Sequence, residues 1–178
     1  MGAAMKIIST IACLGAVVIS ASAAHAEVWG IKTDEDPLDD TKTAVVTQLQ
    51  KGGGLNPFAL GAKCWEGRPG STTLMLASPM RYDHSASYKD QVDVVFRVDK
   101  NEKITIPLAI TELGGRLIFA TTAEQEENVF KLFSQIAAAK QRIGVGVEGT
   151  VLTFPAKGAA KAFAEFTKTC SLPLTPSS

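Results

Sequence analysis

Histidine is scarce in this chain of 178 residues, and the motifs that organise common catalytic sites are missing with it. Only His25 and His84 occur, and there is no Cys-x-x-Cys or Gly-x-Ser-x-Gly sequence. A histidine-based zinc site, a thioredoxin-like redox site and an α/β-hydrolase nucleophile are therefore not indicated. The glycines 52–54 lead to no Gly-Lys-Ser/Thr, which excludes a phosphate-binding loop. We expect a protein that is not an enzyme and that holds no metal or cofactor.

Net charge is also absent, because 18 basic side chains balance 18 acidic ones. This balance argues against nucleic acid or an anionic membrane surface as the partner. No stretch beyond the first thirty residues is apolar and long enough to cross a bilayer. We expect a soluble product whose partner is another protein, and the sequence leaves its oligomeric state open.

The first 26 residues have the three parts of a bacterial signal peptide. Lys6 provides a positive start, an apolar run of about 13 residues spans 7–19, and Ala24-His25-Ala26 matches the small-residue cleavage pattern. A retained membrane anchor is the alternative, but the run is shorter than the roughly 20 residues that a spanning helix needs. We expect cleavage before Glu27 and export to the bacterial periplasm or the medium.

Three cysteines are present, and cleavage would remove Cys13. The remaining pair, Cys64 and Cys170, predicts one disulfide in an oxidising compartment. A metal ligand or a catalytic thiol is the alternative, but two cysteines and one histidine make a poor ligand set. The disulfide is the simpler interpretation.

Hydrophobic periodicity predicts a single α+β domain over residues 43–171. An acidic, exposed leading segment (27–42) precedes it, and a loose tail (172–178) follows it. We expect a mainly antiparallel sheet or sandwich of about eight strands, because period-two patterns recur between short turns. These patterns lie within 43–50, 60–65, 72–76, 91–99, 104–110, 117–121, 143–147 and 151–154. Helical spacing appears near 122–140 and again after Pro155, which predicts two helices packed on the sheet.

Two side chains tie the predicted elements together. Trp29 is the one aromatic residue of the leading segment, and we expect it to be the anchor that docks on the core. On the last helix, Ala159, Phe163, Phe166 and Cys170 share one stripe. That stripe directs Cys170 toward the sheet, where the alternation of the strand near residue 60 places Cys64.

The polar segment 78–90 contains the candidates for partner contact. Arg81, Tyr82 and Tyr88 belong to residue types that are enriched at interface hot spots. His84 and the strand residue Arg97 complete the set of candidate contact residues. An ordinary mobile loop remains the alternative interpretation of this segment.

Two chemical interpretations stay open beside partner binding. His84 next to Asp83 could serve as a general base for Ser85 or Ser71, although nothing in the sequence frames either serine as a nucleophile. The acidic cluster 34–40 could bind calcium, but it lacks the ligand order of an EF-hand loop. Turn formation and solvation explain that cluster better.

The order of motifs resembles the type VI secretion-associated VasI-like family of exported proteins. Trp29 is followed by Asp36-Pro37-Leu38-Asp39-Asp40-Thr41-Lys42-Thr43, and a strand then ends in Cys64. Val94-Val95-Phe96-Arg97-Val98-Asp99 matches a later strand of the family, and Phe154, Gly158 and Cys170 match its closing helix. A weaker likeness is to the invasion-associated locus B family, which usually carries more cysteines.

The resemblance implies an exported accessory protein of a secretion system, without a catalytic site to carry over. We therefore expect a periplasmic, non-enzymatic binding or accessory protein with a partner in the cell envelope. One alternative is a periplasmic inhibitor of a cell-wall hydrolase, similar to lysozyme inhibitors. The other is a small hydrolase that uses His84.

Overall fold

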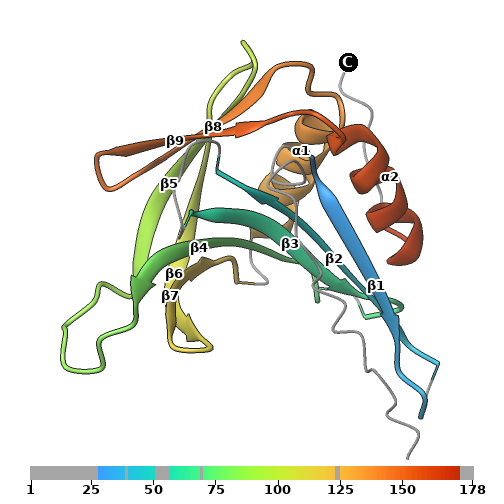
Figure 1. Cartoon of the computed structure of the whole chain (residues 1–178), viewed down its shortest axis with the longest axis horizontal. Helices are drawn as coiled ribbons and strands as arrows, with labels where there is room; N and C mark the ends of the chain where they lie inside the picture. Colours follow the sequence, from blue (N-terminus) through green and yellow to red (C-terminus); the bar gives the residue numbers. More distant parts are fainter. Residues whose placement is uncertain (1–27, 39, 51–56, 69, 123–124, 173–178) are drawn as a thin grey trace, which may run out of the picture.

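The computed structural model of the protein describes residues 28–38, 40–50, 57–68, 70–122 and 125–172 (Figure 1). The expected signal peptide (1–26) and the tail beyond residue 172 lie outside these ranges. Asp39 of the acidic cluster and the glycines 52–54 lie outside them as well.

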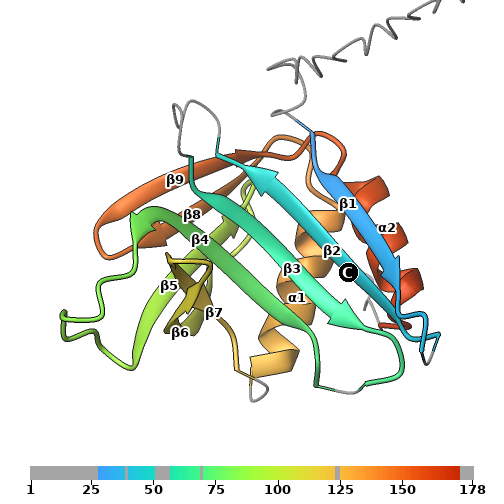
Figure 2. The same cartoon turned by 60° about the horizontal axis from the view of Figure 1, so that its bottom comes forward.

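Nine strands form one antiparallel sheet in the described chain (Figures 1 and 2). They are β1 (Gly30–Glu35), β2 (Lys42–Leu49), β3 (Ala59–Trp65), β4 (Thr73–Arg81), β5 (Gln91–Val98), β6 (Ile104–Leu113), β7 (Arg116–Ala120), β8 (Arg142–Val147) and β9 (Thr150–Pro155). Their spatial order is β1-β2-β3-β4-β7-β6-β5-β8-β9. The sheet curls, and β2, β4, β5 and β8 bury alternate residues on one face. The predicted α+β class is confirmed.

Two helices pack against the buried face of this sheet. α1 (Glu126–Ala137) contacts β5 and β6, and α2 (Ala159–Thr169) contacts β1, β2 and α1. Figure 2 shows α2 running beside β1 and β2. Neither helix, nor any other helical stretch in the described ranges, has the length and apolar character of a membrane span.

Aromatic side chains from the helices fill the core. Phe133 of α1 packs against Phe163 and Phe166 of α2, with ring centroids 5.2 and 5.8 Å apart. All three rings are almost fully buried. Fully buried side chains of this size each contribute about 1.5–3 kcal/mol by leaving water, which makes the helix pair the centre of the fold.

Trp29 connects the start of β1 to the chain that follows β9. Its main-chain N–H donates to the oxygen of Lys157 at 3.2 Å, and its ring stands edge-on to Phe163 with centroids 5.3 Å apart. Gly158 adopts a φ of +84° there, and a Cβ at that position would approach a Val28 methyl carbon to 2.6 Å. The expected docking of Trp29 on the core is confirmed.

The leading segment differs from its expected description in one respect. Residues 30–35 pair with β2 as the edge strand β1, in a register that sets Gly30 opposite Thr47 and Glu35 opposite Lys42. Five of its six residues are exposed, which agrees with the expected exposure. An edge strand that is exposed to solvent on both faces has no alternation of apolar and polar residues, so its sequence resembles that of a polar coil.

Candidate functional site

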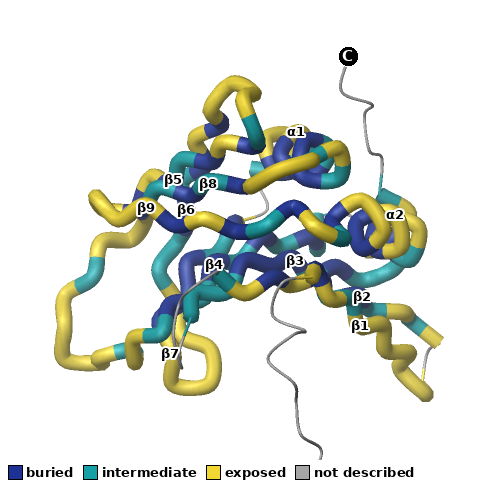
Figure 3. The backbone as a smooth tube through the Cα atoms, turned by 45° about the horizontal axis from the view of Figure 1, so that its top comes forward, coloured by how far each residue is buried: buried dark blue, intermediate teal, exposed yellow. Residues whose placement is uncertain are grey.

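The loop between β4 and β5, residues 82–90, extends away from the helices (Figure 1). It brings together three of the predicted contact residues as a row of rings. The centroid of Tyr82 lies 5.1 Å from that of His84 and 4.9 Å from that of Tyr88. Both tyrosines are half-buried, and the residues between them are exposed (Figure 3). We call Tyr82, His84 and Tyr88 the aromatic row.

Hydrogen bonds within the loop fix the row. The main-chain N–H of Asp83 donates to the Tyr88 hydroxyl at 3.1 Å. One carboxylate oxygen of Asp83 accepts both the N–H of Ser85, at 2.9 Å, and its hydroxyl, at 2.7 Å. Ala86 N–H closes a turn onto the Asp83 carbonyl at 3.1 Å. In this structure the loop is held by four hydrogen bonds, all of which involve the main chain or the side chain of Asp83.

Asp83 titrates at lower pH than an ordinary aspartate. The Ser85 hydroxyl and the Ser85 N–H stabilise its charged form, the neighbouring His84 acts in the same direction, and these effects outweigh the opposing effect of burial on the pKa. The same carboxylate oxygen accepts both hydrogen bonds from Ser85, which links the low pKa of Asp83 to the conformation of the loop.

The β6–β7 hairpin supports the row from one side. Tyr82 N–H donates to the carbonyl of Gly115 at 3.0 Å, and Glu112 accepts the N–H of Gly115 at 2.8 Å. The other oxygen of Glu112 lies 3.8 Å from His84 Nε2. The His84 side chain itself is 77% exposed, so its ring is available to a partner.

The serines proposed for a hydrolase are engaged elsewhere. The Ser85 hydroxyl donates to Asp83, and the Ser71 hydroxyl bonds the main chain of Trp65 in both directions at 3.3 Å. Neither hydroxyl is hydrogen-bonded to His84 within the described residues. A serine nucleophile is activated by such a hydrogen bond, and this geometry does not provide one for Ser71 or Ser85.

The two predicted arginines lie outside the aromatic row. Arg81 belongs to β4, which continues four residues into the segment expected to be loop, and it pairs in register with Arg116 of β7. The pairing of β4 with β7 shifts in register between Ala77 and Arg81, and Pro79, which has no N–H to donate, lies within that irregular stretch. Arg97 lies on the outward face of β5, beside Gly144 of β8. The prediction that placed the start of the loop at residue 78 was wrong.

Arg97 lines a separate concavity of about 530 Å³ on β5, β8 and β9. Its other charged lining residues are Asp99, Lys100, Lys103 and Arg142. Sequence reasoning missed this feature. The sequence does contain an indication of it. In the strand 142–147, the two outward residues that follow Arg142 are Gly144 and Gly146, which leave that face without side chains.

Asp99 organises one end of this concavity. At a φ of +51°, its carboxylate accepts the N–H groups of Lys140, Gln141 and Arg142 at 2.8–2.9 Å. Burial acts to raise the pKa of Asp99, but these three N–H groups and the charge of Lys140 outweigh it and lower the pKa. Asp99 thereby fixes the start of β8 against the end of β5.

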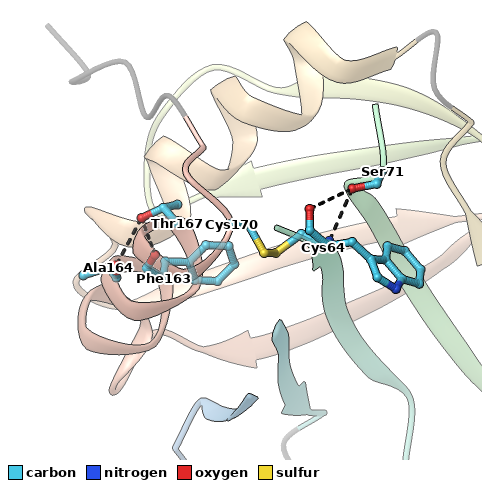
Figure 4. The surroundings of a disulfide bond; sticks show 7 residues. Cys64, Ser71, Phe163, Ala164, Thr167 and Cys170 are labelled. Atoms are coloured by element: carbon cyan, nitrogen blue, oxygen red, sulfur yellow. Dashed lines mark hydrogen bonds between the residues drawn. A yellow bond between two sulfur atoms is a disulfide. The ribbon is translucent and has the colours of Figure 1, made fainter. Parts of the chain in front are cut away.

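The predicted disulfide is confirmed. Cys64 of β3 and Cys170 at the end of α2 are bonded, with Cα atoms 6.1 Å apart (Figure 4). Thr167 donates to the Phe163 carbonyl at 2.8 Å in the same turn of the helix. The bond joins the sheet to the last helix across 106 positions of the chain.

The described residues contain no group of three or more His, Cys, Asp or Glu side chains arranged to hold a metal ion. Comparisons of this chain with models of protein families, with curated proteins and with solved structures find no match.

Proposed function

We propose that the protein is a non-enzymatic binding protein of the bacterial cell envelope, and that the aromatic row is its contact surface for a protein partner. The observation that carries the proposal is the contact between the rings of Tyr82, His84 and Tyr88 on the 82–90 loop, which extends away from the helices and leaves the His84 ring exposed. The resemblance to the VasI-like family suggests that this partner is a component of a type VI secretion apparatus.

A pre-ordered aromatic loop suits protein binding for energetic reasons. Tyrosine supplies a large contact area with few rotatable bonds, so little side-chain entropy is lost when a partner binds. The Tyr88 hydroxyl and the Asp83 carboxylate already hold the loop, which lowers the ordering cost of association. The exposed imidazole of His84 adds a polar group to which a partner can hydrogen-bond.

The leader sequence and the disulfide support the proposed compartment. Residues 1–26 have the pattern of a signal peptide, and disulfides persist in the periplasm but are rare in the cytosol. The full chain would then fold after export, with the partner in the same compartment.

The test is photo-crosslinking in native cells. Ala86, exposed in the loop, is replaced by p-benzoylphenylalanine, and adducts of the full-length protein are identified by mass spectrometry. Lys161, exposed on α2, carries the same residue in the control. We expect an adduct with an envelope protein from position 86 and none of that partner from position 161.

Purified partner then gives the matched comparison. Tyr88→Ala removes the ring and should weaken binding at least about tenfold, the loss typical of an interface hot spot. Tyr88→Phe keeps the ring and removes only the acceptor for Asp83 N–H, so its loss should be smaller. Equal crosslinking from both positions, or unchanged affinity in both variants, would contradict the aromatic row as the contact surface.

The inhibitor alternative relies on the same loop and is distinguished by partner identity. Recovery of a cell-wall hydrolase, together with loss of its activity on adding purified protein, would favour an inhibitor. Recovery of secretion components without such inhibition would favour the accessory role.

A further inference from the structure

The outward face of β8 is a trough because its middle residues have no side chains. In the ladder, Gly144 lies between Arg97 of β5 and Thr153 of β9. The next outward position, Gly146, lies between Val95 of β5 and Val151 of β9. At both positions, side chains of β5 and β9 therefore flank the bare backbone of β8. These residues line the concavity of about 530 Å³, a volume within the range of small-molecule sites.

The fold does not require glycine at either position. Neither Gly144 nor Gly146 lies in the left-handed region of φ. A Cβ at Gly144 would meet its nearest atom, the Arg97 carbonyl oxygen, at 3.5 Å, and one at Gly146 would meet the Val95 oxygen at 3.8 Å. These are ordinary contacts. Glycine inside a strand is otherwise unfavourable and often marks a place where a ligand approaches the backbone closely.

One end of the trough is strongly cationic. Four exposed basic side chains line it, and these are Arg97, Lys100, Lys103 and Arg142. None of them is within 4.0 Å of a carboxylate in the part of the chain that the structure describes. Among the described lining residues the carboxylate is that of Asp99, which accepts hydrogen bonds from three main-chain N–H groups. The cations are thus left to interact with a ligand.

The opposite end is apolar. Val95 is half-buried, and Val151 is 80% exposed although it is a large aliphatic residue of a strand. Arginine guanidinium groups match carboxylate and phosphate oxygens in a two-pronged geometry, and lysines add point charges. We propose that the trough is a binding site for a small organic anion, with its phosphate or carboxylate group toward Arg97 and Arg142 and its apolar part over Gly146 toward Val95 and Val151.

This site is separate from the aromatic row and does not depend on the proposed protein partner. The test is an NMR titration of the mature protein labelled with ¹⁵N. Phenyl phosphate and phthalate are the two probes, one for each acidic group, and inorganic phosphate and sodium chloride at matched ionic strength are the controls. We expect saturable shifts of the Gly144 and Gly146 amides with at least one probe, and weaker binding of inorganic phosphate.

Variants then distinguish a site from general charge attraction. Gly146→Val fills the trough with a strand-favouring side chain and should weaken probe binding at least tenfold, and the doubly substituted Arg97→Gln/Arg142→Gln should do the same. The control is Arg116→Gln/Lys131→Gln, which removes two exposed cations that do not line the trough and should leave the affinity unchanged.

Each result bears on the proposal. Binding of one probe alone assigns the acidic group and supports it. Shifts that follow ionic strength only, or equal affinity in the trough variants and the control, would overturn it. The amide spectrum of Gly146→Val shows whether this variant is folded. If the folded variant binds the probes as tightly as the unmodified protein, the proposed site is overturned as well.

Discussion

The indole Nε1 of Trp29 donates a hydrogen bond of 2.9 Å to the main-chain oxygen of Pro155, 126 positions further along the chain. Together with the bond from Trp29 N–H to Lys157, it joins the residue before β1 to the end of β9 and to the segment that leads into α2. Trp29 therefore links the two edges of the nine-stranded sheet through both its main chain and its side chain.

Trp29→Ala should be among the most destabilising single substitutions in the domain. The residue is 4% exposed, and truncating a buried Trp typically costs about 3–5 kcal/mol. Trp29→Phe keeps an aromatic ring against Phe163 but loses the bond to Pro155, so its cost should be smaller. Urea unfolding of both variants measures the two free energies. A loss below 1 kcal/mol in Trp29→Ala would contradict the role given to this residue.

Loss of the disulfide should be similarly severe. Closing a loop of 106 residues stabilises the folded state by about 4–5 kcal/mol when the effect is restriction of the unfolded chain. Cys64→Ala/Cys170→Ala should therefore unfold at markedly lower urea concentration than the oxidised protein. Unmodified protein treated with reductant provides the comparison, and it should unfold near the midpoint of the double variant.

Asp99 should make folding stability sensitive to acid. Its folded-state pKa lies below the unfolded value of about 3.9, so the charged carboxylate stabilises the fold above that pH. This contribution is lost as the pH falls below about 4 and through the folded pKa. Asp99→Asn tolerates the same backbone φ but cannot carry the charge.

The measurement is the difference in unfolding free energy between the unmodified protein and Asp99→Asn. We expect about 1–3 kcal/mol at pH 7, because hydrogen bonds to a charged group are stronger than neutral ones, and a smaller difference near pH 3. Asp83 contributes to acid sensitivity in both proteins, so its effect cancels in this difference. A difference independent of pH would show that the charge of Asp99 is not the cause.

Much of the fold could be predicted from the sequence because the sheet has one buried face. Val92, Val94, Phe96 and Val98 are buried and alternate with outward residues that include Asp93 and Arg97, and such a pattern specifies both strand and register. The apolar stripe of the last helix must face the same buried side of the sheet, and this predicted that Cys170 lies near Cys64. β1 could not be recognised, since an exposed edge strand buries too little to leave a hydrophobic period.

The candidate surfaces were only partly predictable. Tyr82, His84 and Tyr88 were identified by residue type, but the contacts between their rings depend on the turn at Asp83 and on the support of Gly115. Arg97 was identified without its surroundings. The trough arises from the lateral register of three strands, and β5 is separated from β8 and β9 in sequence by two strands and a helix. Local pattern alone cannot supply that register.

Glycine substitutions provide a test of the trough that involves no ligand. Gly61 of β3 is buried, and a Cβ there would lie 2.7 Å from the Val46 carbonyl oxygen and 2.9 Å from a Thr47 methyl carbon. The Val46 oxygen belongs to the paired strand β2 and cannot move without disturbing the ladder. Gly61→Ala should therefore destabilise the protein by about 1–3 kcal/mol, as overpacking typically does.

Gly146→Ala should have the opposite sign. Its Cβ would make only ordinary contacts, and replacing a strand glycine by alanine at a compatible φ typically stabilises by about 0.4–1 kcal/mol through the unfolded chain. Urea unfolding of both variants under one set of conditions measures the contrast. If Gly146→Ala cost as much as Gly61→Ala, the fold itself would require that glycine, and its presence would no longer point to a ligand. A stabilised Gly146→Ala protein would instead mean that the chain carries a glycine which lowers its own stability, as expected where the open space over the backbone has a use.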